Sequence, residues 1–367
     1  MLTDKQFDSL FAKTGFIAPR ARQKETILKI IDAYQSGKRY VIVNAPVGFG
    51  KSAASYTVAQ WFSKSYFLTH QKILQDQYLK DFGMPWVASS QNYECNKVYG
   101  CSCKQCLRTS FNLPRCKNCQ YAQSKKLAFS SPQCSLNYAF MFALSGALRD
   151  KFLEQAREFI VCDEAHLLAD ELIARGTIEI NVETHLKMQH IYDSNISLGI
   201  PNFEMMSDQQ AMEWVLGPYH EFVVAKKNEI ACQIEAFGDP TKISHSQKKY
   251  FRKLTAADMY YTQHKCQISD LCDFALKSID DVVVIKTENS VSLKPLSSKG
   301  LFEPLLGQYG NKFLFMSGTI LDRDHFCEDL GISPNECEYI SLDSDFPVEN
   351  RPINHWPVGY LTFAEKA

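Results

Sequence analysis

A glycine-rich segment, APVGFGKS at residues 45–52, has the residue types that bind nucleotide phosphates. Gly48 and Gly50 let the backbone turn so that several N–H groups converge on phosphate oxygens. Lys51 would reach the β- and γ-phosphates, and the hydroxyl of Ser52 would bind Mg²⁺. The alternative is a chance glycine-rich turn, but an apolar run precedes the segment and a helical pattern follows it. We therefore predict a site for ATP and Mg²⁺.

Two acidic residues, Asp163 and Glu164, directly follow the apolar run 159–162. A carboxylate at the end of a strand neighbouring the phosphate loop can hold Mg²⁺ through water. An adjacent glutamate can orient and deprotonate an attacking water molecule. A solvated acidic turn is the alternative, and the presence of Lys51 and Ser52 disfavours it. We predict Asp163 as a Mg²⁺ residue and Glu164 as the base.

A third group is a short segment rich in cysteine: Cys95, Cys101, Cys103, Cys106, Cys116 and Cys119. This segment is basic and has few large apolar residues, so a metal centre would supply the stability that a core cannot. The pairs Cys103/Cys106 and Cys116/Cys119 have C-x-x-C spacing. Either a four-thiolate zinc site or an iron–sulfur cluster fits this pattern, and composition does not choose between them.

Buried strands must position these groups. Apolar runs at 40–43, 66–69, 159–162 and 313–316 predict strands of a parallel sheet, and a helix is expected at 53–62. The predicted fold class is therefore α/β, with a phosphate-binding loop on a parallel sheet. Small polar residues follow two of these strands, where such sheets place ligand contacts: Thr69, His70 and Gln71, and Ser317, Gly318 and Thr319.

Two further features lie outside this core. Gln23, just upstream of the loop, could read the adenine edge through its paired donor and acceptor; an exposed polar residue is an equal alternative. The stretch 202–277 has a helical pattern, with long helices expected near 218–237 and after residue 248. Gly238-Asp239-Pro240 separates them, which predicts an antiparallel helical hairpin as a separate insert.

The bulk composition limits the class of protein. With 367 residues, 45% of them hydrophobic, the chain can form more than one domain. The formal net charge of −1 means that nucleic acid binding must depend on local patches. The N-terminus lacks an export-signal pattern and no apolar run could span a bilayer, so we expect a cytoplasmic protein without membrane contact. Under these conditions 13 cysteines indicate metal or redox chemistry.

The order of the motifs resembles that of the superfamily 2 DNA helicases: Arg20-x-x-Gln23, residues 45–52, Thr69-His70-Gln71, the cysteine segment, Asp163 to His166, and Ser317-Gly318-Thr319. The position of the cysteine segment before the Asp-Glu-Ala-His box makes the chain similar to the XPD-like and DinG-like iron–sulfur helicases. Asn92-Tyr93-x-Cys95 and Cys119-Gln120-Tyr121 resemble the two ends of that family's cluster domain.

This resemblance implies a RecA-like motor domain that uses ATP to move 5′-to-3′ on single-stranded and fork-like DNA. It implies a [4Fe–4S] cluster, with Cys95, Cys103, Cys106 and Cys119 as ligands and Cys101 and Cys116 as alternates. By the same resemblance, Gln23 contacts adenine, and Lys51 and Ser52 bind phosphate and Mg²⁺. Asp163 also binds Mg²⁺, and Glu164 activates the attacking water. The residues that would couple hydrolysis to motion are His166, Ser317, Gly318 and Thr319, and those that would contact the DNA backbone are Thr69, His70 and Gln71.

The resemblance divides the chain into motor parts and two inserts. The predicted motor segments are 1–86, 129–190 and 282–345, with the cluster insert at 87–128, an all-helical arch insert at 191–281 and a crossing to a second motor domain at 346–367. The rest of that second domain, with its arginine-bearing box, has no counterpart here, so we expect this fragment to hydrolyse ATP poorly. Two alternatives remain: a DNA-binding sensor module without a motor, and an RNA helicase with a structural zinc.

Overall fold

The computed structural model describes residues 2–20, 22–96, 102–103, 118–147, 152–190, 194, 196–236, 244–276 and 279–344. Its strands are β1 (Tyr40–Asn44), β2 (Ser65–Thr69), β3 (Gln133–Asn137), β4 (Arg157–Asp163), β5 (Ile178–Asn181), β6 (Val282–Thr287), β7 (Ser290–Pro295), β8 (Gly310–Ser317) and β9 (Cys337–Ser341). Its α-helices are α1 (Asp4–Phe11), α2 (Gln23–Gln35), α3 (Lys51–Ala59), α4 (Lys72–Phe82), α6 (Gln120–Ser130), α7 (Tyr138–Ala147), α9 (Leu168–Gly176), α10 (Val182–Gln189), α11 (Asp208–Trp214), α12 (His220–Ala236), α13 (His245–Asp270), α14 (Phe302–Leu305) and α15 (Arg323–Leu330).

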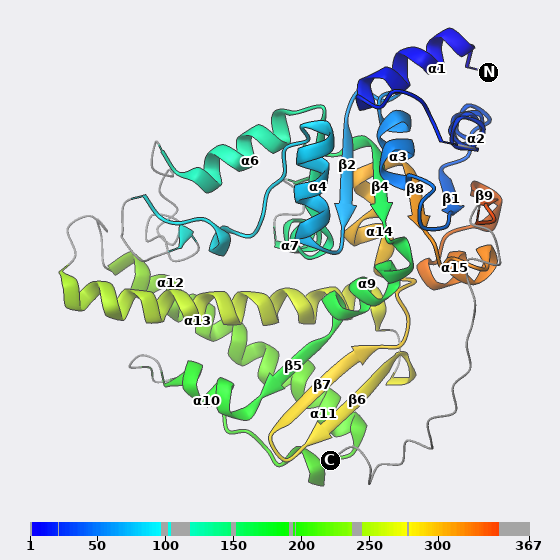
Figure 1. The fold of residues 1–367 in the computed structure, drawn as a ribbon. Coiled ribbons are helices and arrows are strands. Elements are labelled where there is room, and N and C mark those ends of the chain that lie inside the picture. Colours follow the sequence, from blue (N-terminus) through cyan, green and yellow to red (C-terminus); the bar gives the residue numbers. More distant parts are fainter. Residues whose placement is uncertain are drawn as a thin grey trace, which may run out of the picture.

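A six-stranded parallel sheet in the order β3-β2-β4-β8-β1-β9 forms the centre of the upper part of the molecule (Figure 1). Its strands are apolar on both faces, as parallel strands covered by helices must be. On β1, Val41 and Val43 pack with the helices α1 to α4, whereas Tyr40 and Ile42 pack with α7, α9, α14 and α15. The sheet is therefore the middle layer of three, which confirms the predicted α/β class.

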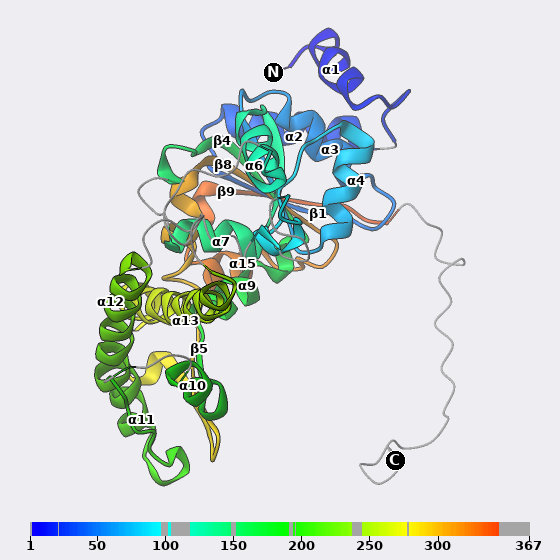
Figure 2. The same ribbon diagram turned by 90° about the vertical axis from the view of Figure 1, so that its left-hand side faces the viewer.

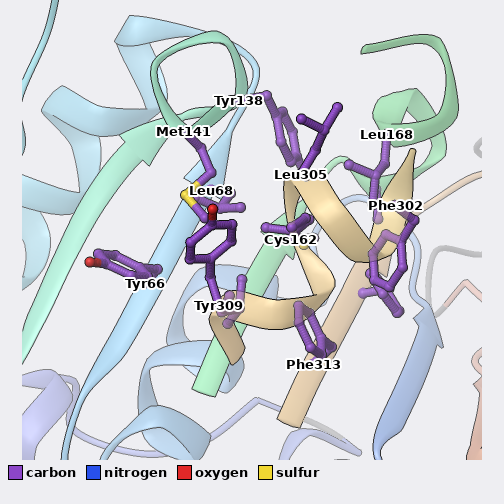
Figure 3. Packing of buried hydrophobic residues seen from close by; sticks show 14 of the residues in the cluster. Tyr66, Leu68, Tyr138, Met141, Cys162, Leu168, Phe302, Leu305, Tyr309 and Phe313 are labelled. Atoms are coloured by element: carbon purple, nitrogen blue, oxygen red, sulfur yellow. The ribbon is translucent and has the colours of Figure 1, made fainter. Parts of the chain in front are cut away.

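The face covered by α7, α9 and α14 has a dense aromatic core, part of which Figure 3 shows. Tyr138, Phe313 and Tyr309 are fully buried there, together with Cys162 and Leu168. Burying an aromatic or a large aliphatic side chain of this kind contributes about 1.5–3 kcal/mol relative to leaving it exposed. The core holds β4 and β8 against the helices that follow them, and so keeps the ends of these strands in place.

Strand β8 lies between β1 and β4, whereas the sequence places the Asp163 strand directly beside the phosphate loop. β8 pairs with both neighbours: Asn44 of β1 faces Ser317, and Asp163 of β4 faces Met316. All of these strands are apolar, so their local patterns do not distinguish the order in which they pair. In the observed order, the C-terminal ends of β1, β8 and β4 still lie at the same edge of the sheet.

A second structural unit lies below the parallel sheet in Figure 1 and holds α10 to α13 and an antiparallel sheet in the order β5-β7-β6. Helices α12 and α13 pack together as the expected hairpin, and Figure 2 shows them beside β5. Strand β6 belongs to this second sheet and not to the parallel one, because Val282, Val291 and Leu293 share a core with the helices. The domain boundaries drawn from the sequence otherwise stay predictions.

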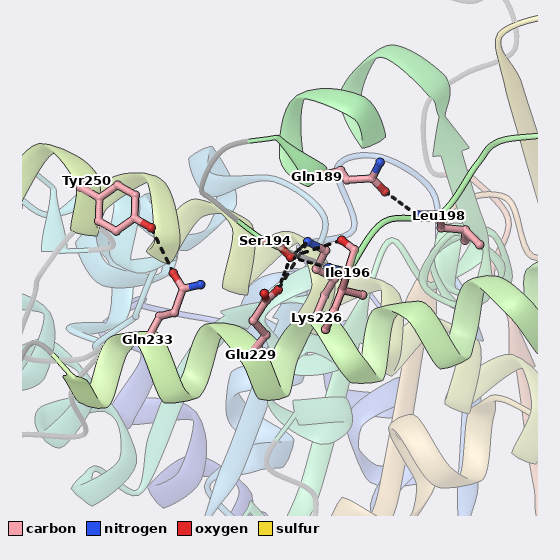
Figure 4. Close-up of polar contacts among 8 residues, drawn as sticks. All are labelled: Gln189, Ser194, Ile196, Leu198, Lys226, Glu229, Gln233 and Tyr250. Carbon is pink, nitrogen blue, oxygen red and sulfur yellow. Dashed lines mark hydrogen bonds and ion pairs between the residues drawn. The ribbon is translucent and has the colours of Figure 1, made fainter.

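A buried polar cluster fixes one loop of this unit to α12 (Figure 4). The carboxylate of Glu229 accepts a hydrogen bond from Ser194 at 2.6 Å and lies 3.4 Å from the ammonium nitrogen of Lys226. Lys226 is fully buried, and burial lowers the pKa of its ammonium group. Nearby, the backbone N–H of Leu198 donates to the side-chain oxygen of Gln189 at 2.9 Å. Within the described helices, none combines the length and apolarity needed to cross a membrane.

Candidate nucleotide site and cysteine cluster

The phosphate loop connects the end of β1 to the start of α3, as the sequence predicts. Gly50 has a φ of 86° and caps α3, which begins at Lys51. A Cβ atom at Gly50 would lie 2.6 Å from the amide nitrogen of Gln23, so only glycine fits there. The N-terminus of α3 therefore points its free N–H groups at the loop, which is the arrangement that binds phosphate.

Gln23 contacts this loop from α2 and is buried. Its side-chain N–H₂ donates to the carbonyl oxygen of Gly50 at 2.9 Å, and its side-chain oxygen accepts from the backbone N–H of Arg20 at 3.0 Å. Arg20 in turn donates from its guanidinium to the carbonyl oxygen of Gly48. In this state the amide of Gln23 braces the phosphate loop with the same atoms that the sequence assigns to adenine.

The ammonium group of Lys51 lies inside the loop and donates to the carbonyl oxygen of Ala45 at 3.2 Å. Gly318, directly after β8, lies beside the loop, because a Cβ atom built there would lie 3.3 Å from the carbonyl oxygen of Ala45 and 4.0 Å from the same ammonium nitrogen. A pocket of about 970 Å³ opens over Lys51, Ser52 and Glu164. The loop and the acidic segment thus face a single cavity large enough for a nucleotide.

Asp163 ends β4 and is buried directly before Glu164, which lines the pocket. The hydroxyl of Tyr78, from α4, donates to its Oδ2 at 3.0 Å, and the backbone N–H of Glu164 donates to its Oδ1 at 3.1 Å. The hydroxyl of Tyr138 donates to its backbone carbonyl at 2.9 Å. Burial raises the pKa of Asp163, and the bond from Tyr78 opposes this rise. A buried carboxylate of this kind favours a neighbouring cation.

The next residues form a polar chain toward β8. Glu164 has a left-handed backbone, with φ 49°, and its carboxylate lies 3.5 Å from Nδ1 of His166. The same nitrogen is 2.7 Å from the hydroxyl of Ser317, which is 3.1 Å from the hydroxyl of Thr319. The backbone N–H of Ala45, at the start of the phosphate loop, donates to the carbonyl of Ser317 at 2.8 Å. The motif 317–319 therefore contacts both halves of the site.

The residues expected to contact DNA follow β2 at the same edge of the sheet. Thr69 is fully buried, and its hydroxyl donates to the carbonyl of Gln71 at 3.2 Å. The side chain of His70 is 43% exposed, and its Nδ1 contacts the carboxylate of Glu171. Gln71 is exposed at the N-terminus of α4. The outward-facing side chains of this motif are therefore His70 and Gln71.

Three of the expected cluster ligands, Cys95, Cys103 and Cys119, lie in the described part of the chain and all are buried. Cys106 and the alternates Cys101 and Cys116 lie outside the described residues. The sulfur atoms of Cys103 and Cys119 are 3.9 Å apart, and the backbone N–H of Cys103 donates to the carbonyl of Tyr93 at 2.7 Å. Among the described residues, no group of three or more potential ligands is close enough to hold a metal ion.

The chemistry of the pair nevertheless suits a cation. Burial, and then the neighbouring thiol of Cys119, raises the pKa of Cys103 to about 11. Helix α6 starts directly after Cys119, so its positive N-terminus faces the sulfur atoms and favours their thiolate form. A metal would add the missing positive charge. The described residues that would hold such a metal are the two thiols in contact, Cys103 and Cys119. Cys95 lies close enough to them to raise the pKa of Cys103 further.

Several contributors to these sites carry no sequence signal that singles them out. Tyr78 sits within an ordinary amphipathic helix, and Glu171 within another, yet they contact Asp163 and His70. Tyr138 is different, because it directly follows the end of β3, where ligand-supporting residues gather. Arg20 does carry a signal, because the motif Arg20-x-x-Gln23 already marks it in the sequence.

Among known proteins, this chain matches one family in sequence and resembles XPD structures in fold. Residues 16–199 match the family model described as Type III restriction enzyme, res subunit. The solved structure titled XPD_Helicase superposes with a TM-score of 0.52 at 14% identity, covering 89% of this chain and 63% of that chain. Truncated XPD gives 0.49 at 14% identity, covering 89% of this chain and 100% of that one. Xpd4 of S. tokodaii gives 0.46 at 15% identity, covering 89% and 61%. None of the curated proteins matches this chain.

Proposed function

Because the chain belongs to the family described as Type III restriction enzyme, res subunit, and has the fold of an XPD helicase motor domain, we propose that it is an ATP-dependent motor that moves along single-stranded DNA. The chain spans 63% of the XPD_Helicase chain, so the activity proposed here concerns a motor of which this chain is one part. The observation that carries the proposal is the shared pocket of about 970 Å³, where the phosphate loop faces Glu164.

In this proposal each side chain of the phosphate loop and of the acidic segment has a role. The Lys51 ammonium exchanges its contact with the Ala45 carbonyl for the phosphates of ATP, and the N-terminus of α3 adds its own positive charge. Ser52 and Asp163 are the residues that would hold Mg²⁺, which supplies charge neutralisation at the phosphates when bound. Glu164 accepts the proton of the attacking water. The hydrogen bond between His166 and Ser317 couples this step to the end of β8.

For the nucleic acid, we propose that His70 and Gln71 contact the DNA backbone, with the direction 5′-to-3′ and fork-like DNA as the substrate. The cysteine insert and the helical unit would lie on the DNA path on either side of these residues. Cys95, Cys103, Cys106 and Cys119 would hold a [4Fe–4S] cluster, whose contribution is to fold and stiffen an insert that has little apolar core. The proposed location is cytoplasmic.

The test is ATP binding and hydrolysis by the chain, with and without single-stranded DNA, duplex DNA and single-stranded RNA. Lys51→Ala should lose most nucleotide affinity, and Glu164→Gln should bind nucleotide normally while losing hydrolysis by about a hundredfold or more. Lys64→Ala, outside the pocket, is the matched control. Retention of full ATP affinity by Lys51→Ala would overturn the assignment of the site. Stimulation by RNA alone would instead support an RNA motor.

A further inference from the structure

Helix α9 joins three parts of the molecule that the proposed function requires to communicate. It begins at Leu168, two residues after His166, and it ends at Gly176, two residues before Ile178, the first residue of β5. Its 9 residues span about 13 Å at a rise of 1.5 Å per residue. One end therefore lies at the nucleotide pocket, and the other enters the unit formed by α10 to α13 and the antiparallel sheet.

The inner face of α9 is packed tightly enough for the helix to move as one body. Leu168 and Leu172 are fully buried in the aromatic core. At Gly176, a Cβ atom would lie 3.0 Å from Leu301 and 3.1 Å from Pro295, so the end of the helix packs against the last residue of β7 and the segment that follows it. Close packing of this kind transmits a displacement instead of absorbing it.

A different face of α9 carries two charged residues, Glu171 and Arg175, spaced four residues apart. The carboxylate of Glu171 contacts Nδ1 of His70, at the end of β2. The guanidinium of Arg175 lies 2.9 Å from Oδ2 of Asp270, at the end of α13, with only 14% and 4% of the two side chains exposed. One helix thus holds a proposed DNA-contact residue and the long helix of the insert.

These polar contacts lie beside an open pocket of about 620 Å³ between α7, α9 and α13, which both Glu171 and Arg175 line. Apolar side chains do not fill this part of the space between α9 and α13. The Arg175–Asp270 pair and the hydrogen bond from Gln267 to the carbonyl of Thr177 at 2.7 Å are polar contacts that hold α13 against the C-terminal end of α9. A buried ion pair adds little net stability compared with apolar side chains, so its main effect here is positional.

We infer that Glu171 and Arg175 are positioning residues that couple nucleotide binding at Asp163–His166 to DNA binding at His70 and at the helical insert. Nucleotide in the pocket moves the segment 163–166 and with it α9, and α9 moves His70 through Glu171 and α13 through Arg175. By reciprocity, single-stranded DNA bound at His70 and the insert changes the affinity for nucleotide by the same factor. This inference rests on the proposed function, because it needs both ligands to bind.

The experiment uses the full chain and measures the coupling factor, which is the ratio of the affinities for one ligand with and without the other. The affinity for a labelled oligothymidine strand is determined with and without a non-hydrolysable ATP analogue and Mg²⁺, and the affinity for the analogue is determined with and without the strand. We expect the two ratios to agree and to be about fivefold or more in the unmodified protein. In Glu171→Gln, and in the double variant Arg175→Gln/Asp270→Asn, we expect the factor to approach one. The affinity for nucleotide without DNA should change by less than about twofold.

The double variant removes both charges and so avoids an unpaired buried carboxylate that could unfold the protein. The exchanged pair Arg175→Asp/Asp270→Arg should restore part of the coupling, which a merely structural loss would not do. Arg323→Gln, in an exposed pair with Asp324, is the matched control and should keep the full factor. If the variants lose thermal stability but keep the coupling factor, the inference fails while the proposed function stands. If the unmodified chain binds neither ligand, both fail.

Discussion

The imidazole of His166 lies 2.7 Å, measured from Nδ1, from the hydroxyl oxygen of Ser317, although 151 residues separate them in the sequence. This contact joins the acidic segment after β4 to the small polar motif after β8. Because Ser317 also accepts the backbone N–H of Ala45, the same residue touches the start of the phosphate loop. Ser317 is thus the residue through which both halves of the nucleotide site meet.

The first prediction concerns the substitution Ser317→Ala, which removes the contact between His166 and Ser317. Ser317→Ala should leave nucleotide affinity within about twofold, because the residue lies beside the phosphate loop and donates nothing to it. DNA-stimulated hydrolysis should fall roughly five- to tenfold, since a lost hydrogen bond costs about 1 kcal/mol and 1.4 kcal/mol is a tenfold effect. Steady-state ATPase assays with and without DNA measure both effects. Thr319→Ser keeps its hydroxyl and should behave like the unmodified protein, and equal losses in both variants would contradict the role of Ser317.

The second prediction concerns Asp163 and pH. Burial raises its pKa above the ordinary value of 3.8, so the folded state holds this proton more tightly than the unfolded state does. The free energy of unfolding of the ligand-free protein therefore falls as pH rises from about 3.8 through the raised pKa, and Asp163→Asn should raise the melting temperature at pH 7. The same variant should lose the stabilisation by Mg²⁺ and nucleotide, which is about 2.7 kcal/mol at a ligand concentration of 100 Kd.

Differential scanning fluorimetry with and without Mg²⁺ and nucleotide would measure both parts. Asp170→Asn, on α9 and outside the pocket, is the matched control and should change neither. An Asp163→Asn protein that melts at a lower temperature without ligand would show that the buried carboxylate stabilises the apo fold.

The third prediction concerns two buried histidines in the helical unit. His185 packs 5.2 Å from the ring of Phe222, and His264 contacts the hydroxyl of Tyr219. Burial lowers the pKa of each from 6.5 to about 4. Because the pKa of each histidine is lower in the folded than in the unfolded protein, each contributes to the free energy of unfolding above pH 6.5. This contribution is lost as pH falls from 6.5 toward 4, and it is on the order of 3 kcal/mol per histidine.

Urea unfolding at pH 7 and pH 5, followed by circular dichroism, tests this pH dependence. His185→Phe should reduce the difference between the two conditions by about half, since one of the two shifted groups is gone. His325→Phe, at a side chain that is 75% exposed, should leave the difference unchanged. A pH dependence that survives removal of both buried histidines would assign it to other groups.

The fourth prediction concerns the metal. Protein purified without oxygen should contain about four irons and sulfide per chain, as a [4Fe–4S] cluster requires, together with visible absorbance. Cys119→Ser and Cys103→Ser should each lose most of the iron while the parallel-sheet domain stays folded, because neither cysteine belongs to the core of that sheet. Cys232→Ser, at an exposed position on α12, should keep the iron. Stoichiometric zinc without iron would show a structural zinc site instead.

Much of the nucleotide site can be predicted from local sequence. The loop at 45–52 lies between a buried strand and a helix, as the local pattern predicts, and Gly50, Lys51 and Ser52 stand where the helix begins. Asp163 and Glu164 follow from the same logic, because a residue directly after a buried strand must emerge at the edge of the sheet. The positions of these residues can be predicted because they depend on a few consecutive residues.

Only the tertiary structure decided how those pieces meet. The strands β1, β4 and β8 are all apolar, so nothing in their local pattern indicates that β8 separates the other two. The contacts of Tyr78 with Asp163, of Glu171 with His70 and of His166 with Ser317 join residues 85, 101 and 151 positions apart. Such pairings depend on the packing of whole layers, which is a property of the complete core. The sequence therefore determined which residue types stand at the ends of the strands, and the fold determined which of these residues touch.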